Sequence, residues 1–232
     1  MLLLEVRGLD AFYGDFQALF GVSLEVEEGQ AVALVGANGA GKTTFLRCLV
    51  GLVAEKRGVI RLAGNEIAND EPEEIARLGI ALSPEGRVLF PSLTVEENLR
   101  MGALNGRSGT WSLERVYDLF PLLAERRRQM PMTLSGGQQG LVAIGRSLMA
   151  NPRLLLCDEL SLGLAPVAID QIYACLATIR AEGTAVLLVE QDVRRAVQAA
   201  ERVYCLLEGR VTLAGAARDL GDDQLTRAYF GS

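Results

Sequence analysis

The sequence of 232 residues contains no histidine. Without an imidazole, the chain cannot use the Ser-His or Cys-His pairs of many hydrolases and cannot bind a metal through histidine. The 4 cysteines form no Cys-x-x-Cys pair, which disfavours a zinc site. We expect four buried thiols in a reducing compartment: Cys48, Cys157, Cys175 and Cys205. Any acid–base chemistry must therefore come from carboxylates.

Long apolar runs are also absent. No uninterrupted run approaches the roughly 18–20 residues that cross a bilayer, and Glu5 interrupts the apolar start before a signal-peptide core could form. The net charge of −6 disfavours a protein held mainly by nucleic-acid phosphates. Half of the residues are hydrophobic, enough for one core or for a core with a small subdomain. We expect a cytosolic protein, alone or docked on another one, with no nucleic-acid partner.

Short β-rich runs alternate with helical patterns along the chain, which is typical of an α/β protein. Three runs are continuously apolar, as expected for parallel strands buried on both faces: residues 32–35, 154–157 and 185–189. Three others near the N-terminus are separated by polar turns and predict an antiparallel portion: Leu2–Val6, Val22–Val26 and Val59–Leu62. Residues 202–214 predict a hairpin that turns at Glu208 and Gly209.

The β pattern disappears between about residues 90 and 150, where helical patterns dominate. We expect helices over Val95–Leu104 and Leu113–Arg128, and a third that begins near Gly137. Thr94 and Glu97 fit a capping box at the start of the first of these helices. The segment therefore predicts a helical insertion within an α/β core.

The strongest local signal is Gly36-Ala37-Asn38-Gly39-Ala40-Gly41-Lys42-Thr43, which fits GxxxxGK[ST] between an expected strand and the helical run Thr44–Val50. Its glycines allow backbone N–H groups to converge on a phosphate, which the helix N-terminus also attracts. Lys42, one of two lysines in the chain, would reach the β- and γ-phosphates. Thr43 would place its hydroxyl on Mg²⁺, and Thr44 would lie near the α-phosphate. A purely structural glycine turn would leave Lys-Thr without a packing reason.

Two adjacent acids, Asp158 and Glu159, follow the apolar run 154–157. The carboxyl ends of parallel strands are where ligands of open sheets collect. Asp158 would hold Mg²⁺ through its water shell, and Glu159 would polarise the attacking water. The alternative is an acidic pair at the start of a surface loop. Such a pair would be exposed to water and would need neither a cation nor a role as a base.

A third motif is Leu134-Ser135-Gly136-Gly137-Gln138, which precedes a helical pattern. Ser135 and Gln138 fit a capping box, and a cap alone would be the simplest interpretation. However, Ser-Gly-Gly at a helix N-terminus also offers bare amides and a hydroxyl to a phosphate. One chain cannot easily bring both glycine motifs to a single triphosphate. We therefore expect a site that two subunits share.

The ordered set Gly36–Thr43, Leu134–Gln138 and Leu154–Glu159 resembles the ATP-binding cassette (ABC) ATPases over essentially the whole chain. The resemblance implies that ATP lies between the first motif of one subunit and Ser135, Gly136, Gly137 and Gln138 of its partner. It also implies that Tyr13, which precedes Gly14, stacks on adenine.

The fold that this family implies is a P-loop NTPase core, a mostly parallel sheet flanked by helices, with an N-terminal antiparallel β portion and a helical subdomain. Residues 1–232 would form one ABC ATPase domain, with 1–85 and 151–232 as the ATP-binding core and 86–150 as the helical subdomain.

Several stretches are similar to one ATP-binding subunit of the branched-chain amino-acid importers within this family: Ser83–Arg87 with Phe90–Leu99, Ser161–Pro166, Leu188–Gln191 and Arg227–Gly231. The resemblance implies Mg²⁺-dependent ATP hydrolysis that powers import of hydrophobic amino acids. Its implied partners are membrane permease subunits, a second identical or homologous ATPase subunit and, indirectly, a periplasmic or extracellular binding protein. The chain would lie peripherally on the cytoplasmic face of the inner membrane.

Four positions depart from the general ABC pattern. Glu85 replaces a glutamine that touches Mg²⁺ and water, and it keeps a hard oxygen ligand while adding negative charge. Gln191 replaces a histidine that contacts the γ-phosphate; its amide can donate a hydrogen bond but cannot carry a proton. Leu160 stands in place of a proline, and Ala165 in place of an aspartate. Because Lys42 and Glu159 are intact, we expect an active ATPase.

The segment Glu85–Asn98 would carry motion from the ATP site to a permease, because it joins the core to the helical subdomain. Its apolar residues Leu89, Phe90 and Pro91 suit a docking surface or burial in the subdomain, and the sequence leaves both open.

Other classes of protein share some of these motifs. An ATPase subunit of a urea or lipopolysaccharide transporter resembles the same subgroup and remains open. A soluble ABC protein of translation or DNA repair needs tandem cassettes or a long coiled-coil insertion, for which 232 residues leave no room. A Ras-type GTPase needs Asn-Lys-x-Asp, whereas Lys42 follows Gly41 and Lys56 follows Glu55, so that class is excluded.

Overall fold

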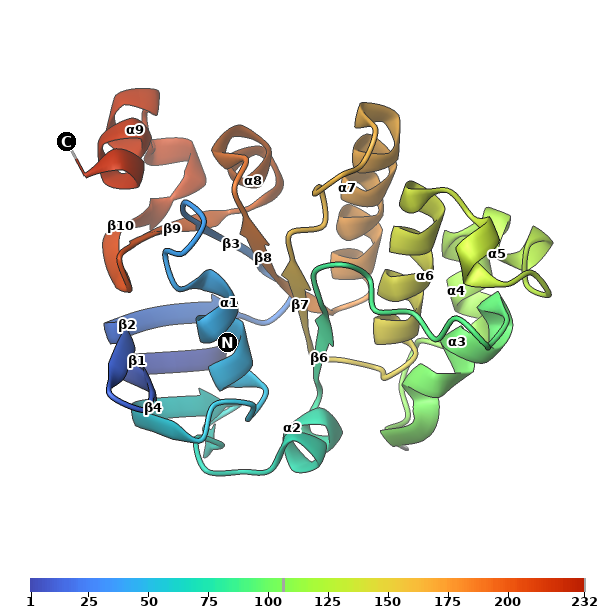
Figure 1. Cartoon of the computed structure of the whole chain (residues 1–232), viewed down its shortest axis with the longest axis horizontal. Helices are drawn as coiled ribbons and strands as arrows, with labels where there is room; N and C mark the ends of the chain where they lie inside the picture. The colour runs from blue at the N-terminus through green and yellow to red at the C-terminus, as the bar shows by residue number, and fades with distance from the viewer. Residues whose placement is uncertain (106, 232) are drawn as a thin grey trace.

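The computed structural model describes residues 1–105 and 107–231, and its strands form two sheets (Figure 1). The antiparallel four-stranded sheet has the order β2 (Phe16–Glu27), β1 (Leu2–Tyr13), β4 (Glu55–Leu62), β5 (Asn65–Glu66). The six-stranded sheet has the order β10 (Arg210–Ala216), β9 (Arg202–Leu207), β3 (Ala31–Val35), β8 (Ala185–Glu190), β7 (Leu154–Asp158), β6 (Ile80–Ser83). It is parallel from β9 to β6, and β10 pairs antiparallel to β9. The expected combination of parallel and antiparallel portions is therefore present.

The apolar strands of the larger sheet divide their side chains between two hydrophobic layers. In β7, Leu154 and Leu156 belong to the core shared with the four-stranded sheet, whereas Leu155 and Cys157 face the core beneath the helices. Alternate residues of a strand point to opposite faces, so a strand covered on both sides must be apolar at every position. This is why the run shows no alternation in the sequence.

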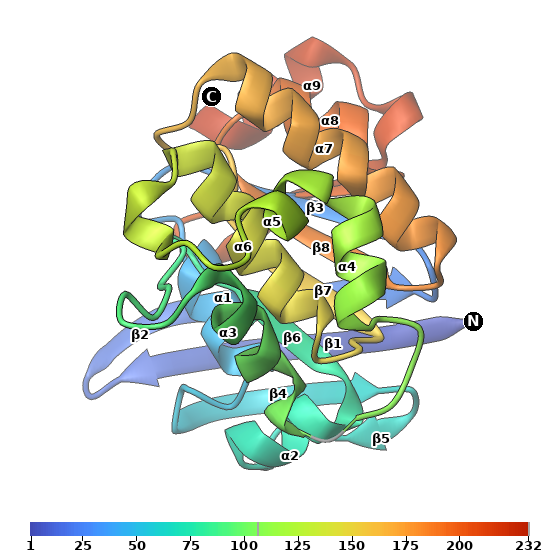
Figure 2. The ribbon, with the colours of Figure 1, turned by 90° about the vertical axis from the view of Figure 1, so that its right-hand side faces the viewer.

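The described residues form nine α-helices: α1 (Lys42–Leu49), α2 (Pro72–Leu78), α3 (Val95–Met101), α4 (Leu113–Leu119), α5 (Pro121–Glu125), α6 (Gly136–Leu148), α7 (Pro166–Ala181), α8 (Val193–Ala199) and α9 (Asp222–Phe230). Helix α1 packs Phe45, Leu46 and Leu49 into the core shared by both sheets. Figure 2 shows α3, α4 and α5 on the outer side of α6 and α7. The helical pattern between β6 and β7 is therefore confirmed.

Two of the expected helices end early. The prediction of one helix over Leu113–Arg128 was wrong, because α4 ends at Leu119 and α5 begins at Pro121. Proline has no N–H to donate and its ring clashes with the preceding turn, so the helix breaks there. The helix that was expected to reach Leu104 ends at Met101 and continues as a 3₁₀ turn over Gly102–Asn105.

The hairpin and three of the four cysteine predictions are confirmed. The chain turns at Glu208 and Gly209, which both have positive φ angles, 47° and 75°. All cysteines are free thiols, but Cys175 of α7 is only half-buried, so the expectation of burial was wrong there. Cys175 still donates its thiol to the Gln171 carbonyl one turn earlier, and burial raises its pKa to about 11.

Candidate active site

The loop between β3 and α1 is built around two glycines that have no room for a side chain. A Cβ at Gly36 would lie 2.3 Å from the carbonyl oxygen of Leu206. A Cβ at Gly41 would lie 2.8 Å from a methyl of Leu19, and Gly41 also has a φ of 104°, which favours glycine. The loop is therefore wedged between β2 and β9, with the N-terminus of α1 at its end.

Lys42 is the first residue of α1, and its side chain folds back into this loop. Its side chain is buried, and the ammonium donates to the carbonyl oxygens of Gly36 at 2.8 Å and Ala37 at 3.1 Å. The same nitrogen lies 3.3 Å from Oε1 of Glu159. The other oxygen of Glu159 accepts a 2.7 Å hydrogen bond from the Gln191 amide. The fold thus joins three predicted site residues that come from α1 and from the ends of β7 and β8.

Asp158, the last residue of β7, is buried beside this group. The nearby Thr43 hydroxyl favours its charged form, but Oδ1 is buried and has no hydrogen-bond partner among the described residues. Burial and then the nearby carboxylates of Glu159 and Glu85 raise the pKa of Asp158 to about 6. A buried carboxylate oxygen without a partner, among other acids, is a position that a cation would stabilise.

The donors around Asp158 fit magnesium. They are hard oxygens, from the carboxylates of Asp158 and Glu85 and the hydroxyl of Thr43. Among the described residues, no group of three or more His, Cys, Asp or Glu residues could hold a metal by itself. Magnesium normally keeps several waters and binds substrate phosphates, so a site with few protein ligands is the form expected for it.

A pocket of about 910 Å³ opens in front of Lys42. The predicted site residues that line it are Tyr13, Asn38, Gly39, Gly41, Lys42, Thr43, Thr44, Glu85, Glu159 and Gln191. A neighbouring pocket of about 140 Å³ contains Asp158 and shares Glu85 and Glu159 with the larger one. Gly36 lies behind the loop, where its carbonyl holds Lys42.

The rim of the larger pocket contains the predicted Tyr13 and two aromatic residues that the sequence interpretation did not include. Tyr13, at the end of β1, is 44% exposed, and Phe16 and Phe20 of β2 line the same rim. The Arg210 guanidinium lies 4.6 Å from the centroid of the Phe20 ring. These residues lie far from the glycine loop in the sequence, and only the β1–β2 hairpin brings them to the pocket.

The motif Leu134–Gln138 lies elsewhere on the chain. Ser135 and Gln138 form the expected capping box of α6, with hydrogen bonds of 3.4 Å and 3.0 Å between them. A Cβ at Gly137 would lie 2.4 Å from the Cβ of Ala168, so α6 packs closely against α7 at this point. No residue from Ser135 to Gln138 lines the pocket of Lys42. One chain therefore does not bring the two glycine motifs together.

The segment that follows Glu85 is fastened to α6 and α3. Arg146 of α6 donates to the carbonyls of Arg87 and Val88, at 3.2 Å and 2.8 Å. The buried amide of Asn98 bonds the backbone of Phe90 in both directions. Leu89 packs against the core beneath the helices, whereas Phe90 is 43% exposed. Of the two alternatives for these apolar residues, Leu89 shows burial in the helical region, whereas Phe90 is exposed as a docking surface would require.

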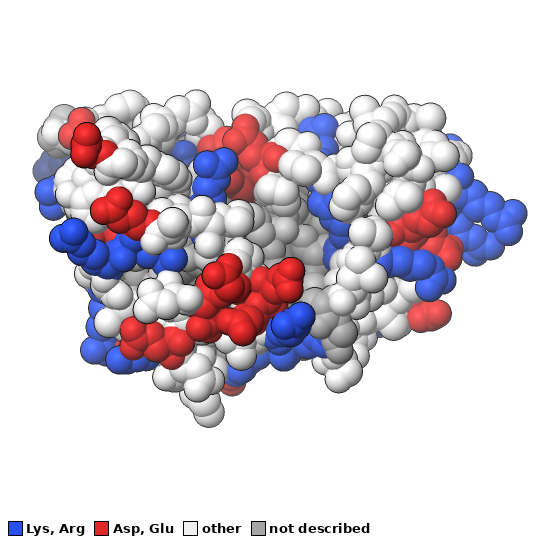
Figure 3. Space-filling view, turned by 60° about the horizontal axis from the view of Figure 1, so that its bottom comes forward, with Lys and Arg blue, Asp and Glu red and all other residues white. Residues whose placement is uncertain are grey.

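Charge on the face seen from below in Figure 1 is mixed. Figure 3 shows an acidic group near the centre of this face, with basic side chains beside it and toward the edges. Among the described residues, this face shows no continuous basic surface of the kind that binds nucleic-acid phosphates. The expectation of no nucleic-acid partner stays a prediction. Over residues 1–105 and 107–231, every helix is too short or too polar to cross a bilayer.

The family of this chain follows from its similarity to known proteins. The model of the ABC transporter family matches residues 19–161, which is more than half of the chain. The chain belongs to the ABC transporter family. This ABC protein is 44% identical to the high-affinity branched-chain amino acid transport ATP-binding protein BraG of Pseudomonas aeruginosa, over 99% of this chain and 100% of that one. It is 32% identical to the lipopolysaccharide export system ATP-binding protein LptB of Haemophilus influenzae, over 100% and 98% of the two chains.

Solved structures confirm the expected fold class for this ABC protein. An ATP-binding cassette of an ABC transporter superimposes with a TM-score of 0.85 at 27% identity and covers 100% of both chains. A dimeric cassette in a post-hydrolysis state, bound to ADP and phosphate, has a TM-score of 0.80 at 26% identity, over 93% of this chain and 99% of that one. The family membership carries with it the coarse activity of an ATPase.

Proposed function

We propose that this ABC protein is the Mg²⁺-dependent ATPase subunit of a membrane importer for branched-chain amino acids. The observation that carries the proposal is the contact of Lys42 with Glu159 in the pocket, 3.3 Å apart and beside Asp158. A buried cation in a phosphate loop and a carboxylate within hydrogen-bond reach of it are the groups that phosphoryl transfer to water requires. The 44% identity to BraG supports the choice of cargo.

Binding of ATP would use the loop 36–41 and the start of α1. The backbone amides and the helix N-terminus would attract the phosphates, and Lys42 would neutralise charge on the β- and γ-phosphates. Thr44 would reach the α-phosphate. Tyr13, on the rim of the same pocket, would stack on the adenine. These interactions bind the nucleotide but do not by themselves supply a base.

Hydrolysis would use Glu159 as the general base. Its carboxylate would accept a proton from water while the water oxygen bonds to the γ-phosphorus, and the bond from that phosphorus to the bridging oxygen would break to release ADP. Gln191 holds one oxygen of this carboxylate at 2.7 Å. Thr43, Asp158 and Glu85 would hold magnesium, which would neutralise the charge that develops on the phosphates.

A second subunit would complete the site. Ser135, Gly136, Gly137 and Gln138 lie outside the pocket of their own chain, so a partner cassette would have to present them. They stand at the N-terminus of α6, where the helix dipole and the backbone amides of the two glycines favour a phosphate. The dimeric cassette bound to ADP and phosphate supports this arrangement. The partner would be an identical or a homologous subunit.

Coupling to the membrane would run through the segment Glu85–Asn98, in a helical subdomain of residues 86–150. A pocket of about 390 Å³ beside this segment is lined by Val88, Phe90 and Met101 together with Arg146. We assign this surface to a membrane permease, since an exposed aromatic residue in a groove suits an apolar helix of a partner. The chain would then lie peripherally on the cytoplasmic face of the membrane, with an external binding protein as an indirect partner.

A lipopolysaccharide exporter is the second candidate, because LptB is 32% identical over the whole chain. Affinity purification of the tagged protein from native membranes, followed by mass spectrometry, separates the two. The importer predicts two polytopic permeases, a second cassette and loss of leucine, isoleucine and valine uptake on deletion. Recovery of envelope-assembly proteins with normal uptake would favour the exporter. Recovery of soluble partners alone would contradict transport while leaving the ATPase intact.

A further inference from the structure

A second buried carboxylate lies next to the site and has no role so far. Glu190, the last residue of β8, is only 1% exposed and directly precedes Gln191. The other residues of β8 are apolar and fully buried. A carboxylate in such a place is unfavourable unless hydrogen bonds compensate for the lost water. Its position in the chain resembles that of Asp158 and Glu159, since it also stands at the carboxyl end of a buried strand.

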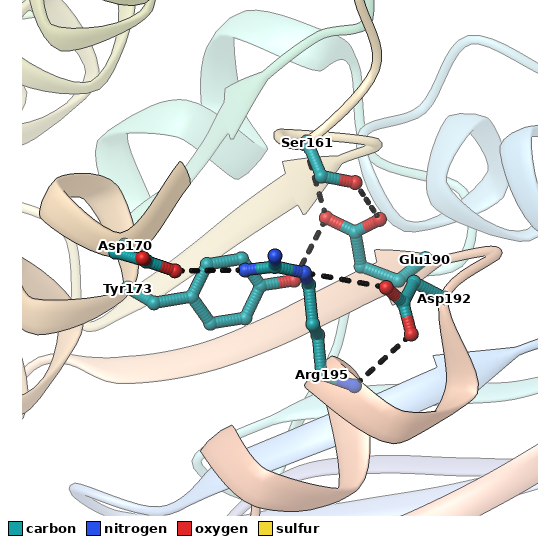
Figure 4. A network of polar contacts seen from close by, with 6 residues as sticks. All are labelled: Ser161, Asp170, Tyr173, Glu190, Asp192 and Arg195. Atoms are coloured by element: carbon teal, nitrogen blue, oxygen red, sulfur yellow. Dashed lines mark hydrogen bonds and ion pairs between the residues drawn. The ribbon is translucent and has the colours of Figure 1, made fainter. Parts of the chain in front are cut away.

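Three uncharged hydrogen-bond donors replace the water that the Glu190 carboxylate loses on burial (Figure 4). Its Oε1 accepts from the Ser161 N–H at 3.3 Å and from the Tyr173 hydroxyl at 3.0 Å. Its Oε2 accepts from the Ser161 hydroxyl at 2.8 Å. Arg195 lies in the same region, but its guanidinium bonds Asp170 and Asp192 instead. Glu190 therefore joins the segment after Glu159 to strand β8 and helix α7.

Glu190, the last residue of β8, and Gln191, which follows it, hold the two ends of the short segment 159–161. Gln191 binds the carboxylate of Glu159, and Glu190 binds the backbone and hydroxyl of Ser161. The Val189 carbonyl also accepts from the Glu159 N–H at 2.9 Å. The three contacts come from three consecutive residues, so they form a single clamp on the segment that carries Glu159.

The segment needs such a clamp because its backbone is strained. Glu159 has a φ of 48°, a left-handed conformation that is unfavourable for residues other than glycine. Such a conformation persists only where the surroundings hold it. The next residue, Leu160, has no ring to restrict its own φ, as a proline would. The restraint must therefore come from outside the segment.

We propose that Glu190 is a positioning residue for ATP hydrolysis, which holds Ser161 and thereby keeps the Glu159 carboxylate oriented toward the reacting water. This inference rests on the proposed role of Glu159 as the base. A merely structural role would be packing of α7 on β8, which would change stability without changing the rate per folded molecule. The two roles are distinguishable by kinetics.

The test is steady-state ATP hydrolysis by the purified full-length protein. Glu190→Ala removes all three acceptor contacts and is expected to lower kcat roughly 10- to 100-fold, which corresponds to the loss of one or two hydrogen bonds to a charged group. The KM for ATP should change less than roughly twofold, because the phosphate loop lies between β3 and α1 and none of the contacts of Glu190 involves it. Glu190→Gln should keep kcat within roughly threefold, because its amide can accept from the Ser161 N–H and donate to the Ser161 hydroxyl.

The control is Asp170→Asn, which removes an exposed carboxylate from the same region of α7 without touching Ser161. It should hydrolyse ATP at the wild-type rate. Tyr173→Phe removes one of the three donors and should lower kcat roughly threefold at unchanged KM. This variant also serves if Glu190→Ala does not fold. A double variant with Glu159→Gln should be no slower than Glu159→Gln alone, because Glu190 acts through Glu159.

Wild-type kcat in folded Glu190→Ala would overturn the inference. So would an equal loss of kcat in Glu190→Ala and Glu190→Gln, which would indicate a role of charge rather than of hydrogen bonding. A further loss in the Glu159→Gln background would show that Glu190 acts elsewhere. Failure of the proposed function is a separate result, since wild-type hydrolysis by Glu159→Gln would remove the base whatever the Glu190 variants do.

Discussion

The ammonium nitrogen of Lys42 lies 3.3 Å from a carboxylate oxygen of Glu159, and both side chains are almost completely buried. Lys42 follows the glycine loop, and Glu159 follows strand β7, which is distant from that loop in the sequence. Their contact places the cation of the phosphate loop and the expected base on one side of the pocket. Phosphates bound by the loop would therefore meet both groups at once.

Lys42→Ala should weaken ATP binding by roughly 100-fold or more, because the loop loses the charge that would neutralise the phosphates. Lys56→Ala is the matched control, since these are the two lysines of the chain. Lys56 lies on β4 and donates to the Val53 carbonyl, away from the pocket. Fluorescent-nucleotide titration measures both variants. Equal affinities in the two would contradict the assignment of Lys42.

Glu159→Gln should lower the rate of phosphate release by roughly 10²- to 10⁴-fold while ATP binding persists, because an amide cannot accept the proton of water. Phosphate release and nucleotide retention by the same sample give the two quantities. Glu73→Gln, at an exposed position of α2, should behave like the wild type. A Glu159→Gln protein that hydrolyses at the wild-type rate would disprove the base assignment.

Ser135→Ala should leave ATP binding by the isolated subunit unchanged but lower turnover at least tenfold, since its hydroxyl would act on the nucleotide of a partner subunit. The substitution also removes the N-cap of α6, at a cost of about 1 kcal/mol. Ser112→Ala, which removes the N-cap of α4, controls for that loss of stability. If nucleotide binding to the monomer falls together with turnover, a site shared between subunits is wrong.

The unfolding free energy should depend on pH through Glu190. Burial is the largest cause that raises the pKa of Glu190 above its usual 4.5, and the Glu159 charge adds to it, while Ser161 and Tyr173 oppose it. Because the folded pKa is above the unfolded one, the contribution to stability is fully present below about 4.5 and is lost as the pH rises through the folded value.

Glu190→Gln has no proton to bind at this position, so its stability should fall less steeply than that of the wild type as the pH rises above about 4.5. Urea denaturation of both proteins between roughly pH 4 and pH 8 measures the two slopes. Parallel curves would show that Glu190 has the same pKa in the folded and unfolded chain.

Local sequence patterns were sufficient to predict the motifs and to predict whether a strand or a helix carries each of them. The apolar runs before Gly36 and Asp158 predicted buried strands, and the glycine motif predicted a phosphate loop at the start of a helix. The capping boxes of Thr94 and Ser135 are present as expected. These features depend on residues close together in the chain, so a sequence expresses them directly. The helix break at Pro121 was not predicted, although a proline inside a helical pattern is a local signal that ends a helix.

Only the tertiary structure decided which distant residues meet. The β1–β2 hairpin brings Phe16 and Phe20 to the pocket rim, and the parallel order of β7 and β8 sets Glu190 beside Ser161. The sequence contained a signal for Glu190, because an acid at the end of a buried apolar run is unusual. It contained none for its partners Ser161 and Tyr173, since serine and tyrosine are common in loops and helices. The sequence by itself determined the phosphate loop, the acidic pair and the family. The physical reason for the division is that strand order and register are set by packing across the whole core, which no local pattern encodes.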